Sequence, residues 1–202
     1  EKEKYLKRIL TAEDVWCQGF SEPDHGSDLG NAQTRAVRDG DEYVINGQKI
    51  WTTMGNFAQY MILLARTNPE AERKYDGLSF FLSPMEVDGV EARPIRKITG
   101  EYGFTETFFN DARIPADCIM GEEGQGWKIA MQTLQYERGA EAGAAGGLSM
   151  IRVTVQDMID NLEGVMRDGK PVLDDPVVRD EVVRAIMEEK ALVLGARRSA
   201  IG

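Results

Sequence analysis

The chain has 202 residues, and its 24 Lys and Arg against 34 Asp and Glu give a formal net charge of −10. This length allows one large domain or two small ones, and a hydrophobic content of 42% is ordinary for a protein that builds its own core. The acidity argues against nucleic acid as a partner, and no apolar run approaches the roughly 18 residues of a membrane span.

The two cysteines indicate a reducing compartment. Cys17 and Cys118 lie far apart in the sequence and match no metal-ligand spacing. We therefore expect free thiols, no metal site and a cytoplasmic location.

The first residues are predicted to be the end of a helix. Residues 1–10 lack the apolar stretch that a secretion signal carries. We assign residues 1–12 to the end of an N-terminal helical region.

Residues 13–126 are predicted to form a β-domain. Thirteen of the 21 glycines and five of the seven prolines lie here, and they divide the apolar residues into short runs. Asn46-Gly47 predicts a hairpin turn between two of these runs. The predicted strands are residues 43–45, 49–53, 60–65, 77–82, 90–92 and 105–110. Short strands separated by turn residues are typical of an antiparallel barrel or sandwich.

Residues 127–202 are predicted to be helical. No proline interrupts residues 127–162, where apolar side chains recur at helical spacing. A polar turn follows at residues 167–171, and Asp174-Asp175-Pro176 predicts the start of another helix. The fold class is therefore α+β, an antiparallel β unit followed by two long helices packed as a hairpin.

Two segments of the β-domain carry side chains suited to binding. Residues 16–30 run from a strand into a loop rich in hydroxyls, glycine and backbone N–H groups, which can hydrogen-bond a planar heterocycle or hold a phosphate. The alternative is a tight turn with local Ser and Asp hydrogen bonds. In residues 47–53, strand alternation places Trp51 and Thr53 on one face, where they can flank a flat ring. The alternative is an aromatic core residue with a β-branched neighbour.

These two segments together resemble the flavin-contacting segments of the acyl-CoA dehydrogenase family. Residues 108–115 with 121–127 resemble the closing strand and exit loop of that family's barrel, and Tyr136-Glu137-Arg138 resembles the start of its C-terminal bundle. The resemblance implies an antiparallel β-barrel middle domain at residues 13–126 and the start of a truncated helical bundle at residues 127–202. It also implies that an N-terminal helical domain and the end of the bundle lie outside this sequence.

The resemblance implies FAD as the cofactor and an acyl-CoA as the substrate. Thr53 would hydrogen-bond near the flavin N5, where hydride arrives, and Trp51 would lie against the ring. The implied cofactor-binding residues are Gln18, Phe20, Ser21, Ser27, Trp51, Thr52 and Thr53. The implied substrate-binding residues are Ser27, Gln135 and Arg138.

Glu137 is the predicted catalytic base. In part of the family the glutamate that takes the α-proton stands at the matching position, whereas in other members it comes from a loop beyond the end of this chain. Glu137 also falls on an otherwise apolar helical stripe with Ala130 and Leu134, where desolvation raises the pKa of a carboxylate. The alternatives are that Glu137 pairs with an arginine within the helix, or that Glu141 is the base.

The function implied by the resemblance is dehydrogenation of an acyl-CoA to the trans-2-enoyl-CoA, with electrons passed to an electron-transfer flavoprotein. One departure is that residues 166–171 lack the Phe-Gly that the family often places near this point to reach the flavin of a neighbouring subunit. The alternatives are a non-catalytic or partner-dependent subunit of a hetero-oligomer, and a related flavin oxidase. Family members are usually oligomers, so we expect a homo- or hetero-oligomer.

Overall fold

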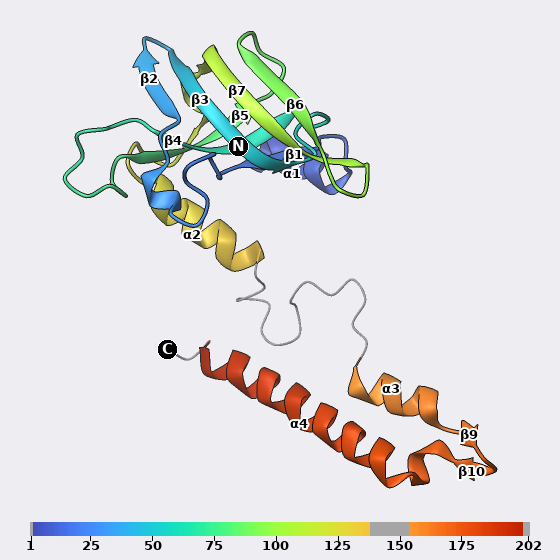
Figure 1. The fold of residues 1–202 in the computed structure, drawn as a ribbon. Coiled ribbons are helices and arrows are strands. Elements are labelled where there is room, and N and C mark those ends of the chain that lie inside the picture. The colour runs from blue at the N-terminus through green and yellow to red at the C-terminus, as the bar shows by residue number, and fades with distance from the viewer. Residues whose placement is uncertain (1, 138–153, 200–202) are drawn as a thin grey trace. The chain divides into compact units, whose positions relative to one another are not determined.

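The computed structural model describes residues 2–137 and 154–199, which fall into two compact units, residues 1–131 and 132–202. Figure 1 shows the helices and strands of both units. The elements of the first unit are α1 (Lys2–Leu10), β1 (Trp16–Gly19), β2 (Arg35–Asp39), β3 (Glu42–Thr53), β4 (Tyr60–Arg66), β5 (Leu78–Pro84), β6 (Val90–Arg96), β7 (Tyr102–Pro115) and β8 (Ile119–Met120). Helix α2 (Gly126–Glu137) crosses the boundary between the units.

The strands of the first unit form one eight-stranded sheet in the order β6-β7-β3-β2-β4-β5-β8, with β1 paired to β4. Most neighbours are antiparallel, which confirms the predicted class. The order is an open path, so the expected barrel is not closed, and β1 runs parallel to β4. A second parallel contact joins Arg35 of β2 to Arg66 of β4.

The hairpin predicted at Asn46-Gly47 is wrong, because both residues lie inside β3. The turn between β2 and β3 is instead at Gly40, which has φ 62°, and Asp41. Asn46 lies opposite a bulge in β7, where its side chain and Asp111 exchange two hydrogen bonds of 2.9 Å. Gly47 has φ 146°, and a Cβ there would approach the Thr34 Cα to 2.7 Å. Turns and bulges use the same permissive residues, so the dipeptide marks irregular backbone without saying which kind.

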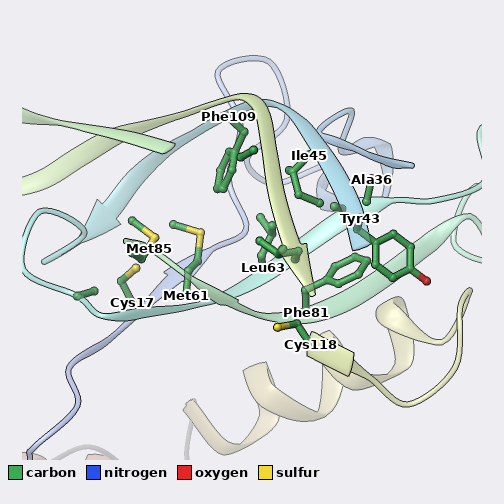
Figure 2. Packing of buried hydrophobic residues seen from close by; sticks show 14 residues of the cluster. Cys17, Ala36, Tyr43, Ile45, Met61, Leu63, Phe81, Met85, Phe109 and Cys118 are labelled. Carbon is green, nitrogen blue, oxygen red and sulfur yellow. The ribbon is translucent and has the colours of Figure 1, made fainter. Parts of the chain in front are cut away.

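The hydrophobic core lies within this sheet (Figure 2). Ile45 from β3, Leu63 from β4, Phe81 from β5 and Phe109 from β7 are almost completely buried in it. Both cysteines are free, as expected from their spacing, and the structure shows that both are buried. Burial raises the pKa of the Cys17 thiol to about 12, so this side chain stays protonated and serves packing.

The second unit contains a helical hairpin, but its first arm, which was predicted as part of one long helix over residues 127–162, is a short helix that begins after an N-cap at Thr154. Its elements are α3 (Val155–Leu162), β9 (Met166–Arg167), β10 (Lys170–Pro171) and α4 (Pro176–Ser199). Thr154 and Asp157 cap α3 reciprocally, and the Val155 N–H donates to the Glu189 carboxylate of α4 at 3.3 Å. The part of the predicted helix at residues 138–153 lies outside the described residues. Among the helices that the structure describes, none combines the length and apolar character needed to cross a bilayer.

Candidate functional site

The two segments singled out in the sequence are joined in the structure. The backbone N–H of Ile50 in β3 donates to the carbonyl of Ser21 at 2.9 Å. This bond places the hydroxyl-rich loop beside the end of β3 that carries Trp51 and Thr53. The loop and the strand therefore form two adjoining parts of one site.

A buried ion pair lies directly beneath this junction. The Lys49 Nζ is 2.8 Å from the Glu22 Oε1, and it also donates to the carbonyl of Phe20 at 3.1 Å. Lys49 is fully buried and Glu22 is 6% exposed. The Glu22 carboxylate also accepts the backbone N–H groups of Gln33 at 2.6 Å and Thr34 at 2.8 Å. Both charges are therefore compensated by charge-assisted hydrogen bonds.

The ion pair keeps Glu22 ionised. Burial alone raises the pKa of this carboxyl group, but the Lys49 ammonium and the two backbone N–H groups outweigh burial and hold the pKa below 4.5. Burial also lowers the pKa of Lys49 from 10.5, and the Glu22 charge opposes that change. The two side chains are therefore coupled, because the charge of each favours the charged form of the other.

Arg66 of β4 supports the far end of the loop. Its guanidinium donates to the carbonyls of Ala32 at 2.9 Å, Gly30 at 3.0 Å and Lys74 at 3.0 Å, and its side chain is largely buried. An exposed pair between the Lys74 Nζ and Asp28, at 2.9 Å, adds a contact on the outside. Three carbonyls on one planar cation hold two neighbouring loops in one arrangement.

A bulge orients the end of β3. Ile50 and Trp51 together lie opposite a single residue of β7, and Trp51 has φ 61°, a strained conformation for a residue with a side chain. Trp51 is 58% exposed and contacts the edge of Phe104, with ring centroids 6.1 Å apart. Thr53 is also exposed. The bulge therefore leaves Trp51 and Thr53 exposed although Lys49, which regular alternation places on the same face, is buried.

Thr52 differs from its neighbours. Its side chain is fully buried, and its Oγ1 has no hydrogen-bond partner among the described residues. Its carbonyl accepts a bond of 3.2 Å from Thr105. The structure does not bring the Thr52 side chain to the surface that Trp51 and Thr53 share. Thr52 can therefore contact a flavin only through its main-chain atoms.

The remaining predicted flavin contacts lie in β1, which carries Gln18, and in the loop that follows it. Gln18 and Ser21 are half-buried and Ser27 is exposed, whereas Phe20 is buried against the edge of Phe80. Within the described residues, the hydroxyls of Ser21, Ser27 and Thr53 make no hydrogen bond to the protein. An exposed indole beside hydroxyls that remain free to bond fits a planar, hydrogen-bonding heterocycle such as a flavin.

Of the predicted substrate and base residues, Gln135 and Glu137 lie at the end of α2. Gln135 and Glu137 are exposed, and Glu137 is the last residue of the helix. Ala130 is buried and Leu134 is half-buried, whereas Arg138 and Glu141 lie outside the described residues. The catalytic role of Glu137 and the substrate contacts therefore stay predictions.

Comparison with protein families decides the identity of the fold. The model of the acyl-CoA dehydrogenase middle domain matches residues 17–112, and the model of the acyl-CoA dehydrogenase C-terminal domain matches residues 124–201. The chain belongs to the acyl-CoA dehydrogenase family. This confirms the resemblance that the loop and the tryptophan strand indicated.

Individual acyl-CoA dehydrogenases are similar over nearly the whole chain. Acyl-CoA dehydrogenase IpdE1 of Mycobacterium tuberculosis is 41% identical over 185 residues, covering 92% of this chain and 46% of the relative. The solved Tcur3481-Tcur3483 steroid ACAD is 36% identical with a TM-score of 0.76, covering 99% of this chain and 50% of that one. The ChsE4-ChsE5 complex from Mycobacterium tuberculosis is 30% identical with a TM-score of 0.74, covering 98% and 50%. The chain spans about half the length of the curated relatives it matches.

The supporting network of this acyl-CoA dehydrogenase chain was missed from the sequence. Glu22, Lys49 and Arg66 carry no motif of their own, and charged residues are ordinarily predicted to be solvated. One signal was present in the sequence. Alternation along the strand places Lys49 on the same face as the apolar residues Tyr43, Ile45 and Trp51. A cation at such a position requires a buried partner.

We expect the Glu22 carboxylate to make the stability of this chain depend on pH. Because folding lowers its pKa, the stabilisation is complete above pH 4.5 and is lost as the pH falls through the lowered value. Chemical denaturation between about pH 7 and pH 3 measures this loss, and Glu22→Gln is expected to reduce the slope of the curve below pH 4.5. Identical slopes for the two proteins would show that Glu22 titrates alike in the folded and unfolded states.

Proposed function

We propose that the protein is an FAD-dependent acyl-CoA dehydrogenase, which converts an acyl-CoA to the trans-2-enoyl-CoA and passes electrons to an electron-transfer flavoprotein. The observation that carries the proposal is the bond between the Ile50 N–H and the Ser21 carbonyl. It supports a single binding surface on which an exposed indole adjoins hydroxyl groups. Family membership supports the reaction type.

The chain's own residues supply the binding groups for the flavin. Trp51 offers its ring face and Thr53 its hydroxyl, while Ser21 and Phe20 contribute through the loop. Gln18 and Ser27 extend the same surface at its two ends. Bound FAD would accept the hydride that leaves the β-carbon of the substrate.

Substrate activation is assigned to the end of α2 and the loop. In this proposal Glu137 takes the proton from the carbon next to the thioester, while the C–H bond of the β-carbon breaks with loss of hydride. Gln135 and Arg138 hold the thioester, and the Ser27 hydroxyl contacts the acyl-CoA.

An absorbance experiment on the full-length protein tests this function. We expect a bound yellow flavin whose absorbance is lost anaerobically when an accepted acyl-CoA is added. Because one similar structure is that of a steroid ACAD, the panel includes straight, branched, aromatic and steroid-linked thioesters. A protein that purifies without flavin and binds none, or a flavin that no thioester reduces, contradicts the proposal. Oxygen uptake without an electron-transfer flavoprotein would identify an oxidase instead.

A second candidate is a subunit that needs a different partner chain. Two of the similar structures are described by a pair of protein names, Tcur3481-Tcur3483 and ChsE4-ChsE5. We propose that the protein is an oligomer in both candidates. It is a homo-oligomer if the protein alone binds FAD and dehydrogenates an acyl-CoA. If the protein alone is inactive and regains activity with a partner chain, this second candidate is the correct one. The buried free thiols support a cytoplasmic location.

A further inference from the structure

The Glu22 carboxylate links the two ends of the hydroxyl-rich loop by hydrogen bonds. Glu22 stands at the start of the loop, and its Oε1 is 2.8 Å from the Lys49 Nζ. The same carboxylate accepts the N–H groups of Gln33 and Thr34, which follow the loop at its other end. The chain between Glu22 and Gln33, including the exposed Ser27, is therefore anchored on a single buried side chain.

The partner of that carboxylate comes from β3, the strand that adjoins the loop. Lys49 directly precedes the bulge that Ile50 and Trp51 form in β3, and Thr53 lies two residues beyond Trp51. Its ammonium also donates to the carbonyl of Phe20, next to Ser21. The ion pair thus joins the loop to the strand at the point where both present their exposed side chains.

Burying this ion pair costs free energy, which the geometry of the pair can explain. A buried ion pair is often no more stabilising than apolar residues of the same shape, because both charges lose their hydration. Here the pair is fully enclosed, whereas other pairs of similar length, such as the 2.7 Å pair of Arg93 with Glu91, are exposed. A charged pair with fixed hydrogen-bonding directions specifies one arrangement of the two segments, which apolar contacts do not.

We propose that Glu22 and Lys49 are positioning residues for the flavin: their buried ion pair sets the separation between the loop that carries Ser21 and Ser27 and the strand that carries Trp51 and Thr53. The proposal rests on the proposed flavin function. Neither residue reaches the exposed surface, so both act through the segments they hold. Loosening the pair lets the loop shift relative to the strand without removing any group that contacts the ring.

The test compares three full-length proteins from which the flavin has been removed. They are the wild type, the double variant Glu22→Gln/Lys49→Met and the control Arg93→Met. The double variant removes both charges together, so no unpaired charge is left in the core. Hydrogen exchange is measured on peptides covering residues 20–34 and 48–53, with residues 78–84 of β5 reporting on the fold. The dissociation constant for FAD is measured by flavin fluorescence.

We expect the double variant to exchange at least tenfold faster at residues 20–34 and 48–53 with β5 unchanged, and to bind FAD at least tenfold more weakly. Arg93→Met is expected to match the wild type in both measurements. Wild-type exchange and affinity in a folded double variant would overturn the positioning role alone. Wild-type protein that binds no FAD would overturn the proposed function and this role with it.

If β5 also loses protection in the double variant, Glu22→Asp decides. It keeps the charge but is one methylene shorter, so it cannot reach the Lys49 ammonium and both backbone N–H groups together. We expect the same local loss of protection and the same weakening of FAD binding as in the double variant. Unchanged protection and affinity in Glu22→Asp would contradict the proposal.

Discussion

Replacing Lys49 by methionine is expected to lower the free energy of unfolding by about 3–5 kcal/mol, because Glu22 is left buried without its counter-charge. The methionine fills a similar volume, so little of the loss comes from packing. Glu22 then either stays ionised without a partner or takes up a proton and weakens its bonds to Gln33 and Thr34. Urea denaturation followed by tryptophan fluorescence measures the change.

A double-mutant cycle separates the ion pair from the rest of the loss. Glu22→Gln is expected to cost less in the Lys49→Met protein than in the wild type, with a coupling of about 1–3 kcal/mol. The matched control is Arg93→Met, which breaks an exposed pair of nearly the same length on β6 and is expected to leave stability almost unchanged. If Lys49→Met and Arg93→Met lower the free energy of unfolding equally, burial of the ion pair does not decide the effect.

Replacing Glu137 by glutamine is expected to slow the loss of flavin absorbance by about 10²–10⁴-fold when an acyl-CoA is added anaerobically. Glutamine keeps the size of the side chain and removes its ability to accept the α-proton. FAD content is expected to stay at the wild-type level, because Glu137 lies outside the loop and strand that form the flavin surface. The measurement is a stopped-flow absorbance trace with the best thioester of the panel.

The control for Glu137 is Glu181→Gln, a substitution of an exposed glutamate on α4. It is expected to reduce its flavin at the wild-type rate. If Glu137→Gln is reduced at the full rate, the base lies elsewhere, and Glu141→Gln becomes the next variant to measure. If Glu137→Gln loses its FAD, the residue supports the fold or the cofactor and its assignment as the base is wrong.

Several elements of the fold were predictable because their causes are local. The apolar run at residues 60–65 became β4, and the run at 77–82 became most of β5. Asp174-Asp175-Pro176 predicted the start of α4 at Pro176, where proline fits the first turn. The order of the motifs also indicated the family, since each motif is a short stretch of sequence.

Other features depended on which segments meet. Asn46-Gly47 predicted a hairpin, but the chain continues in β3 because Asp111 and Thr34 lie against these two residues. Trp51 and Thr53 are both exposed, as alternation predicted, but only pairing with β7 introduces the bulge that leaves Lys49 buried. Such features arise from strand register, which local propensity does not specify.

The sequence by itself determined the strand-forming runs, the helix starts and the two segments that carry the indole and the hydroxyls. Only the tertiary structure decided that these segments adjoin, that Thr52 faces inward, and that Glu22 pairs with Lys49. The two charged residues lie 27 positions apart, so no local pattern relates them. They meet because sheet pairing brings β3 beneath the loop, and burial then makes each charge require the other.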